Sequence, residues 1–438
     1  MRMKLLLILF STAAIAACSH ALNPIIPEGE FFSDPAPRVG PDGTLWIFGS
    51  RDETINSWCT VFNDVIETRN LVDFKLHKGV LASNGDADAI PESNALLYAP
   101  DAIFLNGKWH IFYCMPDKNH REGVVDAVLP TGPYSGSRKV VGCNAIDPSI
   151  FRDDDGTLYY NWGQFALSGA VFKPDLSGID PATVHNNIIS EAGHNFHEGI
   201  QLTKRNGIYY LVFADIGRRR TPTCIGYATS DKPFGPYVYR GVIIDNYGCD
   251  AQSWNNHGGI FEHNGRWYVL YHRSTNGTRY LRKACIEPIA FDENGFIAEV
   301  EMTSNGAGPE LDPFQDTPAR IACTLSGKAH IKTLPDKHER LSGLNAGDSA
   351  TWRYFNFTRN PIELVMRIIP NGGGYIELRD AKGASYGIAK VPSGNGNDIT
   401  EIRLPLTRPF PIGRGAVVLG FNGKQNTPLF ELDSFIFR

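Results

Sequence analysis

The chain has 438 residues, a formal net charge of −5, 44 glycines, 17 tyrosines and 25 phenylalanines. Because the balance is slightly acidic and no basic run is longer than Arg218-Arg219-Arg220, a nucleic-acid partner is excluded. The length allows two or three domains, and the many glycines and aromatic residues favour an all-β, turn-rich protein.

The N-terminus is typical of a secretory signal. Met1–Lys4 is basic, Leu5–Phe10 is apolar, and small residues precede Cys18. This end resembles a bacterial lipobox, which predicts a signal peptide over residues 1–17, a lipid on Cys18 and export to the bacterial cell envelope, in the periplasm or at the outer membrane. Ordinary cleavage near Ala17 is the alternative. The apolar run is too short for a mature transmembrane helix, so the expected membrane contact is the lipid anchor alone.

Five times along residues 23–306, a polar residue precedes a glycine-centred turn by six to nine positions, and an aromatic-rich run follows. Asp-Gly and Asn-Gly between such runs are strong hairpin signals. The turn glycines recur 49 to 64 residues apart, which is the period of a propeller blade. The five repeats therefore predict a five-bladed β-propeller. The polar residues and their turns are Asp34 with Asp42-Gly43, Asp101 with Asn106-Gly107, Asp147 with Asp155-Gly156, Glu198 with Asn206-Gly207, and His257 with Asn264-Gly265.

A second repeat supports this interpretation. Residues 129–134 and 232–237 both end in Gly-Pro-Tyr and fall where an outer strand of a blade is expected to begin. A glycine- and proline-rich break at 304–309 then indicates a linker over residues 307–318. Residues 319–438 consist of short alternating runs separated by turn residues, which predicts a β-sandwich, jelly-roll-like domain.

Equivalent positions of radially arranged blades converge on the central axis, so the four acids and His257 are expected to meet there. Convergent carboxylates without a Ser/His pair or a zinc signature indicate acid–base chemistry. Glycoside hydrolysis needs one carboxylic acid to protonate the leaving oxygen and one carboxylate to activate water, ~6.5–9.5 Å apart for inversion. A third acid nearby can keep the first one protonated.

The motifs around these residues resemble glycoside hydrolase family 43, in the family's order and over the whole predicted propeller. That resemblance implies five blades and inverting chemistry on arabinose- and xylose-containing glycans. The matching segments are Ser33-Asp34-Pro35, Tyr98-Ala99-Pro100-Asp101, residues 145–151 around Asp147, His197-Glu198-Gly199, residues 233–237, and His257-Gly258-Gly259-Ile260.

By this resemblance Asp34 is the general base, Glu198 the general acid, and Asp147 the acid that orients Glu198 and tunes its pKa. His257 matches a histidine near the axis that often lies beside a cation, commonly calcium, although no cofactor is required. Tyr98 replaces the family's usual tryptophan and is expected to line the pocket with Asp101.

Several structural alternatives stay open. An Asp-Pro aspartate can cap its own turn, Asp101 can bond to the turn at Asn106-Gly107, and His257 can be a buried histidine without an ion. Arg273 and Arg282 follow the last inner strand, and either one is a candidate for contact with the sugar.

The C-terminal domain resembles family 6 carbohydrate-binding modules around residues 344–354, 374–379 and 430–435. Such modules stack sugar rings on exposed aromatic side chains. The module's usual N-terminal glutamate segment is not clearly present, so a degenerate module that only packs on the propeller is the alternative. The candidate sugar-binding residues are Trp352, Tyr354, Tyr375, Tyr386 and Asn426.

The expected function is an exported inverting glycosidase on arabinose- or xylose-containing plant-type glycans, foremost an exo-α-L-arabinofuranosidase. A β-xylosidase or a galactan-directed enzyme on the same scaffold is the near alternative. A non-catalytic glycan-binding lipoprotein is the alternative from another class, and a protein-binding scaffold is a weaker one. We expect a monomer whose partner is an oligo- or polysaccharide.

Overall fold

The computed structural model describes residues 22–438, and the prediction of an all-β protein is confirmed. Within this range the helices are one short α-helix, α1 (Glu191–His194), and two 3-10 turns, η1 (Pro181–Thr183) and η2 (Ala319–Ile321). No helix of residues 22–438 has the length and apolar character needed to cross a membrane. The predicted signal peptide and Cys18 lie outside the described residues.

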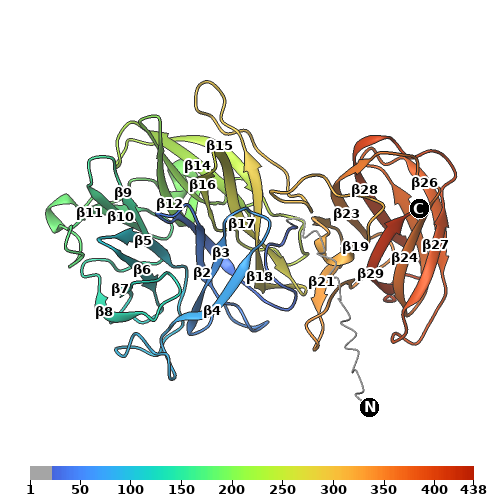
Figure 1. Ribbon diagram of the computed structural model, residues 1–438, viewed down its shortest axis with the longest axis horizontal. Coiled ribbons are helices and arrows are strands. Elements are labelled where there is room, and N and C mark those ends of the chain that lie inside the picture. Colours follow the sequence, from blue (N-terminus) through green and yellow to red (C-terminus); the bar gives the residue numbers. More distant parts are fainter. Residues whose placement is uncertain (1–21) are drawn as a thin grey trace, which may run out of the picture.

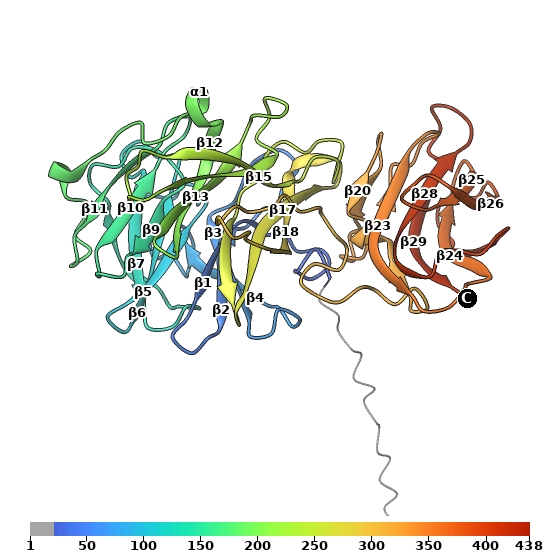
Figure 2. The ribbon, with the colours of Figure 1, turned by 90° about the horizontal axis from the view of Figure 1, so that it is seen from above.

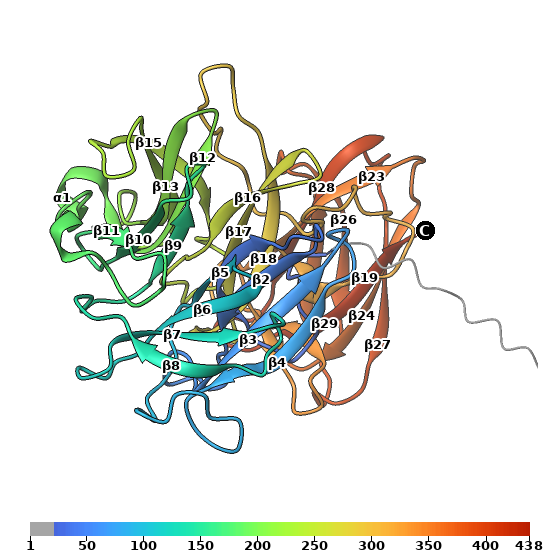
Figure 3. The same ribbon diagram turned by 60° about the vertical axis from the view of Figure 1, so that its left-hand side comes forward.

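The first eighteen strands form five antiparallel sheets, and each sheet is a meander in chain order. Figures 1 and 3 show these sheets following one another around a common centre, so the five-bladed propeller is confirmed. The strands are β1 (Ser33–Val39), β2 (Leu45–Ser50), β3 (Phe62–Thr68) and β4 (Lys75–Ala82) in blade one; β5 (Asp101–Leu105), β6 (Lys108–Cys114), β7 (Glu122–Ala127) and β8 (Ser135–Lys139) in blade two; β9 (Ser149–Arg152), β10 (Leu158–Trp162) and β11 (Ser168–Phe172) in blade three; β12 (Phe196–Arg205), β13 (Ile208–Asp215), β14 (Cys224–Ser230) and β15 (Val238–Asp245) in blade four; and β16 (Gly259–His263), β17 (Arg266–Thr275) and β18 (Thr278–Ile289) in blade five.

The inner hairpins use two kinds of turn. In the three Asn-Gly turns both residues have positive φ, for example 51° at Asn106 and 77° at Gly107, as a two-residue hairpin loop requires. In the two Asp-Gly turns only the glycine has positive φ. There the aspartate side chain closes the turn instead, because Asp155 accepts the N–H of Thr157 at 2.8 Å.

The Gly-Pro-Tyr repeat has one local structure at both places. The Tyr134 hydroxyl donates to the carbonyl of Pro130 and the Tyr237 hydroxyl donates to that of Pro233, each at 2.9 Å. The outer strands β8 and β15 begin directly after these tyrosines. This repeat therefore marks where the outermost strand of a blade starts.

The propeller core consists of apolar clusters between neighbouring blades rather than one central core. Alternate residues of an inner strand face opposite neighbours: Phe48 packs with Trp109 of blade two, whereas Ile47 packs with Leu270 of blade five. Each blade thus needs apolar residues on both faces, which explains the uninterrupted aromatic runs after the turns.

The segment before β1 closes the ring. The N–H groups of Ile25 and Phe32 donate to the carbonyls of Ala284 and Arg282 in β18, each at 2.9 Å. Phe32 forms a parallel bridge with Lys283. The first and last blades are therefore joined by backbone hydrogen bonds, which brings Asp34 next to residues of β18.

The C-terminal strands form two sheets that enclose a second core around Trp352. This sandwich lies beside blade five, as Figures 1 and 2 show. One sheet has the order β21-β22-β29-β24-β27 with β19 beside β29, and the other β20-β23-β28-β25-β26. The strands are β19 (Thr317–Pro318), β20 (Thr324–Leu325), β21 (His330–Thr333), β22 (Glu339–Ser342), β23 (Ser349–Phe357), β24 (Glu363–Pro370), β25 (Gly374–Arg379), β26 (Ser385–Val391), β27 (Thr400–Pro405), β28 (Gly413–Asn422) and β29 (Phe430–Phe437).

Candidate active site

All five blades contribute to one cavity of about 240 Å³. Most of its lining residues come from the starts of the innermost strands and from the loops beside them, and four of the five polar repeat positions converge there. The lining residues are Asp34, Trp58, Cys59, Tyr98, Ala99, Ile146, Asp147, Gln164, His197, Glu198, Trp254, Asn255, His257 and Arg282.

Three blades each place a residue with a positive φ angle at or beside this cavity. Asp34 and Asp147 adopt left-handed φ values of 54° and 58°, and Gly199, which follows Glu198, adopts 66°. Aspartate tolerates this region better than most residues, and such conformations are concentrated at functional sites. A side chain at Gly199 would place its Cβ 3.0 Å from the His257 ring, so glycine also permits this close approach.

Asp34 is almost fully buried among cationic and imidazole groups. Arg282 Nη1 donates to its Oδ1 at 2.7 Å, and the Asp34 N–H donates to Nδ1 of His272 at 3.3 Å. Burial opposes ionisation of Asp34, but the charge of Arg282, aided by His257 and His272, lowers its pKa to about 2. Asp34 is therefore a carboxylate at neutral pH, as a general base must be.

His272 lies beneath Asp34 as a neutral imidazole. Burial, together with the nearby Arg282, lowers its pKa to about 3. Because Nδ1 accepts the Asp34 N–H, Nε2 carries the proton and donates to the carbonyl of Asn255 at 3.1 Å. His257 Nδ1 lies 3.6 Å from Asp34 Oδ1, and burial lowers the pKa of that histidine as well.

Asp52 holds Arg282 in place, and sequence reasoning missed it. Nε and Nη2 of Arg282 donate to the two carboxylate oxygens of Asp52 at 2.8 and 3.0 Å, which leaves Nη1 for Asp34. The Cys59 N–H also donates to Asp52, at 3.1 Å. Asp52 lies outside the repeated positions, so no spacing marked it.

Glu198 and Asp147 form the opposite acidic pair. The N–H of Gly199 donates to Asp147 Oδ2 at 2.8 Å, which ties Asp147 to the strand that carries Glu198. Burial, together with the charges of Glu198 and Asp34, raises the pKa of Asp147 well above its usual range. Asp147 therefore holds its proton more strongly than an ordinary aspartate does. Gln164 Nε2 donates to Glu198 at 2.8 Å and was not predicted from the sequence.

The other predicted propeller residues divide into two groups. Tyr98 and Arg282, the predicted substrate contacts, line the cavity, and so does His257, which was predicted to lie near the axis. Asp101 does not, because its buried carboxylate binds Arg38 and accepts the N–H of Ile150 at 2.8 Å, joining blades one, two and three.

The assignment of Arg273 to sugar binding is also corrected. Its side chain is buried away from the cavity, where Nη2 donates to the carbonyl of Thr303 at 2.7 Å and the guanidinium contacts Tyr271. Arg273 therefore stabilises the junction of blade five with the segment that follows it.

Few of the sandwich residues that were predicted to bind sugar are exposed to solvent. Trp352 is fully buried and its Nε1 donates to the carbonyl of Ala319, so the expectation that it stacks on sugar is wrong. Tyr386 is likewise a core residue. The ring of Tyr354 is covered by Arg414 at 3.4 Å. Tyr375, 47% exposed, and Asn426 are open to solvent.

His257 was predicted to lie beside a cation, commonly calcium. Among residues 22–438, no group of three or more His, Cys, Asp or Glu side chains is arranged to hold a metal ion. His257 itself faces Asp34.

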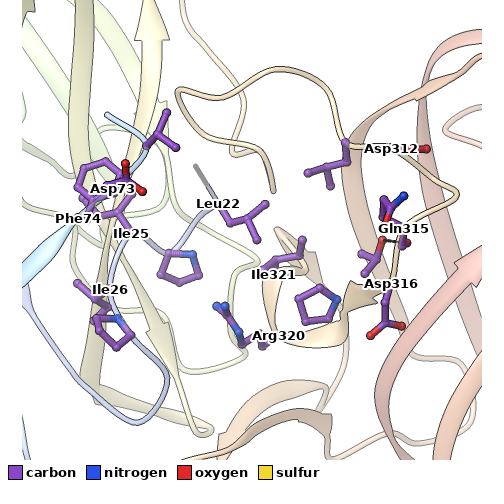
Figure 4. Close-up of a pocket in the computed structure, with 16 residues that line it drawn as sticks. Leu22, Ile25, Ile26, Asp73, Phe74, Asp312, Gln315, Asp316, Arg320 and Ile321 are labelled. Atoms are coloured by element: carbon purple, nitrogen blue, oxygen red, sulfur yellow. Dashed lines mark hydrogen bonds between the residues drawn. The ribbon is translucent and has the colours of Figure 1, made fainter. Parts of the chain in front are cut away.

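A larger cavity, of about 940 Å³, lies between the propeller and the sandwich. Figure 4 shows its apolar side chains, among them Leu22, Ile25 and Ile321, with Asp312 and Asp316 on the sandwich side. It shares no lining residue with the acidic cavity. Its composition is that of a gap between domains, and we assign no catalysis to it.

A five-bladed propeller whose cavity brings an ionised, buried aspartate together with two further acids has the arrangement of a glycoside hydrolase of the acid–base type. Residues 22–297 match the family described as glycosyl hydrolases family 43. The chain belongs to this family.

Relatives agree with this membership. A "Xylosidase/arabinosidase" of Thermoclostridium stercorarium is 30% identical over 69% of this chain and 72% of its own length. An "Arabinoxylan arabinofuranohydrolase" of Bacillus subtilis is 26% identical and covers 95% of this chain and 92% of its own length. The crystal structure of a Bacillus subtilis family 43 arabinoxylan arabinofuranohydrolase in complex with cellotetraose covers 96% of this chain and 99% of that chain, with a TM-score of 0.54 at 23% identity, and shows the same fold.

The enzyme is an inverting glycosidase, and we propose the following roles for its acids. Asp34, ionised beside Arg282, removes a proton from a water that attacks the anomeric carbon. Glu198, in the pair with Asp147, gives its proton to the leaving oxygen while the glycosidic bond breaks. The products are a sugar of inverted configuration and a free hydroxyl on the leaving group, and solvent restores both protonation states.

Proposed function

We propose that this enzyme is an exo-acting α-L-arabinofuranosidase on arabinose-decorated plant-type glycans. The observation that carries the proposal is the size of the acidic cavity. At about 240 Å³ it is smaller than the ~300–1,000 Å³ of common ligand pockets. A cavity of this size suits one terminal pentose ring, and relatives named arabinofuranohydrolases support arabinose.

β-Xylosidase activity is the second candidate, because other relatives are named "Xylosidase/arabinosidase" and "Beta-xylosidase". Release of 4-nitrophenol from the α-L-arabinofuranoside and from the β-D-xylopyranoside compares the two. NMR of the first product anomer tests inversion. Faster release from the arabinofuranoside supports the proposal, and faster release from the xylopyranoside overturns it in favour of the second candidate. No turnover of either substrate, or of arabinan, xylan and galactan, would refute both.

We also propose that the sandwich binds glycan weakly through Tyr375. Its exposed ring lies on β25, whereas Trp352 and Tyr386 belong to the core. Retention on insoluble arabinoxylan should fall in Tyr375→Ala and persist in Ile388→Ala, a control with an exposed aliphatic side chain on the neighbouring strand. Equal retention of both variants would assign the sandwich to packing alone.

Export and lipid attachment at Cys18 remain proposals, supported by the basic, apolar and small-residue pattern of residues 1–18. Metabolic labelling with a radioactive fatty acid, compared between the natural chain and Cys18→Ala, would detect the lipid. Size-exclusion chromatography with light scattering would test the proposed monomer.

A further inference from the structure

We infer that the C-terminal sandwich stabilises the wall of the active site. It bonds to the tip of the β17–β18 hairpin, and side chains of that hairpin contact the two tryptophans that line the cavity. The inference rests on the proposed function for its choice of substrates. It assigns the sandwich a role that does not depend on its binding any sugar.

The tip of the hairpin is bonded to the sandwich. The Asn276 N–H donates to the carbonyl of Ile331 at 2.7 Å, and the Thr333 N–H donates to Asn276 Oδ1 at 2.8 Å. Asn276 Nδ2 donates to the Thr333 hydroxyl at 3.2 Å. Asn276 thus pairs with β21 as a residue of a neighbouring strand would. Figure 1 shows β21 lying next to blade five.

Directly after the tip, β18 leaves the regular ladder. Thr275 pairs with Thr278 but Ser274 pairs with Arg282. Residues 279–281 therefore have no partner in β17 and bulge out of the ladder. Bulges of this kind re-aim side chains and are frequent beside active sites. The position of the tip therefore sets where the side chains of the bulge point.

Those side chains support the two tryptophans of the cavity. The Arg279 guanidinium lies over the Trp254 ring at 4.7 Å, and the Tyr280 ring meets Trp58 edge-on at 4.7 Å. Thr278 also donates to the carbonyl of Ile55, in the loop that carries Trp58. Trp58 and Trp254 line the cavity around the catalytic acids. The bonds between Asn276 and the sandwich therefore help to position Thr278, Arg279 and Tyr280. These three residues in turn contact Trp254, Trp58 or the loop that carries Trp58.

The test removes the side-chain contact without disturbing the turn. Asn276 has φ 60°, so Asn276→Gly retains the left-handed conformation. It removes the two side-chain bonds to Thr333 and the local bond from Nδ2 to the Thr275 hydroxyl at 3.0 Å. Asn206→Gly is the matched control, since Asn206 occupies an equivalent turn with φ 50° and is exposed far from the sandwich contacts. Thr333→Val removes the hydroxyl from the sandwich side.

We expect KM for arabinoxylan to rise about fivefold in Asn276→Gly and Thr333→Val with kcat nearly constant, the order of effect expected when side-chain hydrogen bonds at the interface are lost. In Asn206→Gly both constants should match the natural enzyme. Unchanged KM in both interface variants would overturn the inference.

Hydrogen exchange measured by mass spectrometry gives a second test that needs no activity. Peptides covering residues 51–60 and 250–258 should exchange faster in Asn276→Gly than in Asn206→Gly. If exchange is unchanged there, the inference is wrong. If exchange rises but the natural enzyme acts on no arabinose substrate, the structural role stands and only the proposed function fails.

Discussion

Arg282 Nη1 donates to Asp34 Oδ1 at 2.7 Å, and this bond connects the last strand of blade five to the first strand of blade one. The same ring closure that completes the propeller therefore places a permanent cation against the general base. Because the ion pair is buried, the Arg282 charge lowers the pKa of Asp34 to about 2 and keeps this carboxyl ionised at neutral pH.

Replacing either catalytic acid by its amide should abolish efficient turnover. Asp34→Asn cannot accept a proton from water and Glu198→Gln cannot donate one, so kcat should fall by about 10²–10⁴-fold in each. Thermal unfolding should remain cooperative. The loss in Glu198→Gln should be smaller on 2,4-dinitrophenyl glycosides, whose leaving group needs little protonation. An equal loss on good and poor leaving groups would contradict the role of Glu198 as the acid.

Asp147→Asn should change the pH profile more than the maximal rate. The alkaline limb of kcat/KM reports loss of the proton from the essential acid of the free enzyme. Removing the Asp147 charge weakens the retention of that proton, so the alkaline limb should move to lower pH. Measurement of kcat/KM from pH 4 to 9 tests this. A limb that stays in place would show that Asp147 does not tune the acid.

Asp52→Asn should weaken catalysis although Asp52 does not line the cavity. The amide loses one charge-assisted bond to Arg282, and such bonds contribute about 1.5–3 kcal/mol, so kcat/KM should fall roughly 10- to 100-fold. Asp64→Asn is the control, because Asp64 holds Arg51 in a similar buried pair away from the cavity. Both variants should lose stability. If both also lose the same activity, Asp52 has no positioning role.

Glu122→Gln should make the protein more stable at alkaline pH. Glu122 is fully buried in β7, and this burial raises its pKa to about 8 although the Tyr160 hydroxyl donates to it at 2.6 Å. Between its unfolded pKa near 4.5 and about 8, the native state holds a proton that the unfolded state has released. Stability from this group is thus complete below pH 4.5 and is lost as pH rises, by about 1.4 kcal/mol per unit.

Glutamine removes this titration. Denaturant unfolding of Glu122→Gln at pH 5 and pH 8 should show a smaller difference than in the natural chain. An identical pH dependence in the two proteins would show that Glu122 is ionised in the native state.

The repeated turns and the residues beside them were predictable because a hairpin turn is a local requirement. Asn106-Gly107 needs left-handed backbone wherever it occurs, and the aromatic run after it needs burial on both faces. Asp101 shares the repeat but not the cavity, because its carboxylate is used by Arg38 and Ile150 of adjacent blades. Trp352 looked like a sugar platform, but an aromatic residue in a strand does not reveal which face is the core.

The number of blades, the family and the presence of Asp34, Asp147 and Glu198 in one cavity were all predictable from the sequence, since these depend on spacing and on motifs within short segments. Only the tertiary structure decided which groups surround them. Asp52 and Arg282 lie 230 residues apart and meet because the ring closes. Contact between distant segments follows from how all blades pack together, and no local pattern encodes it.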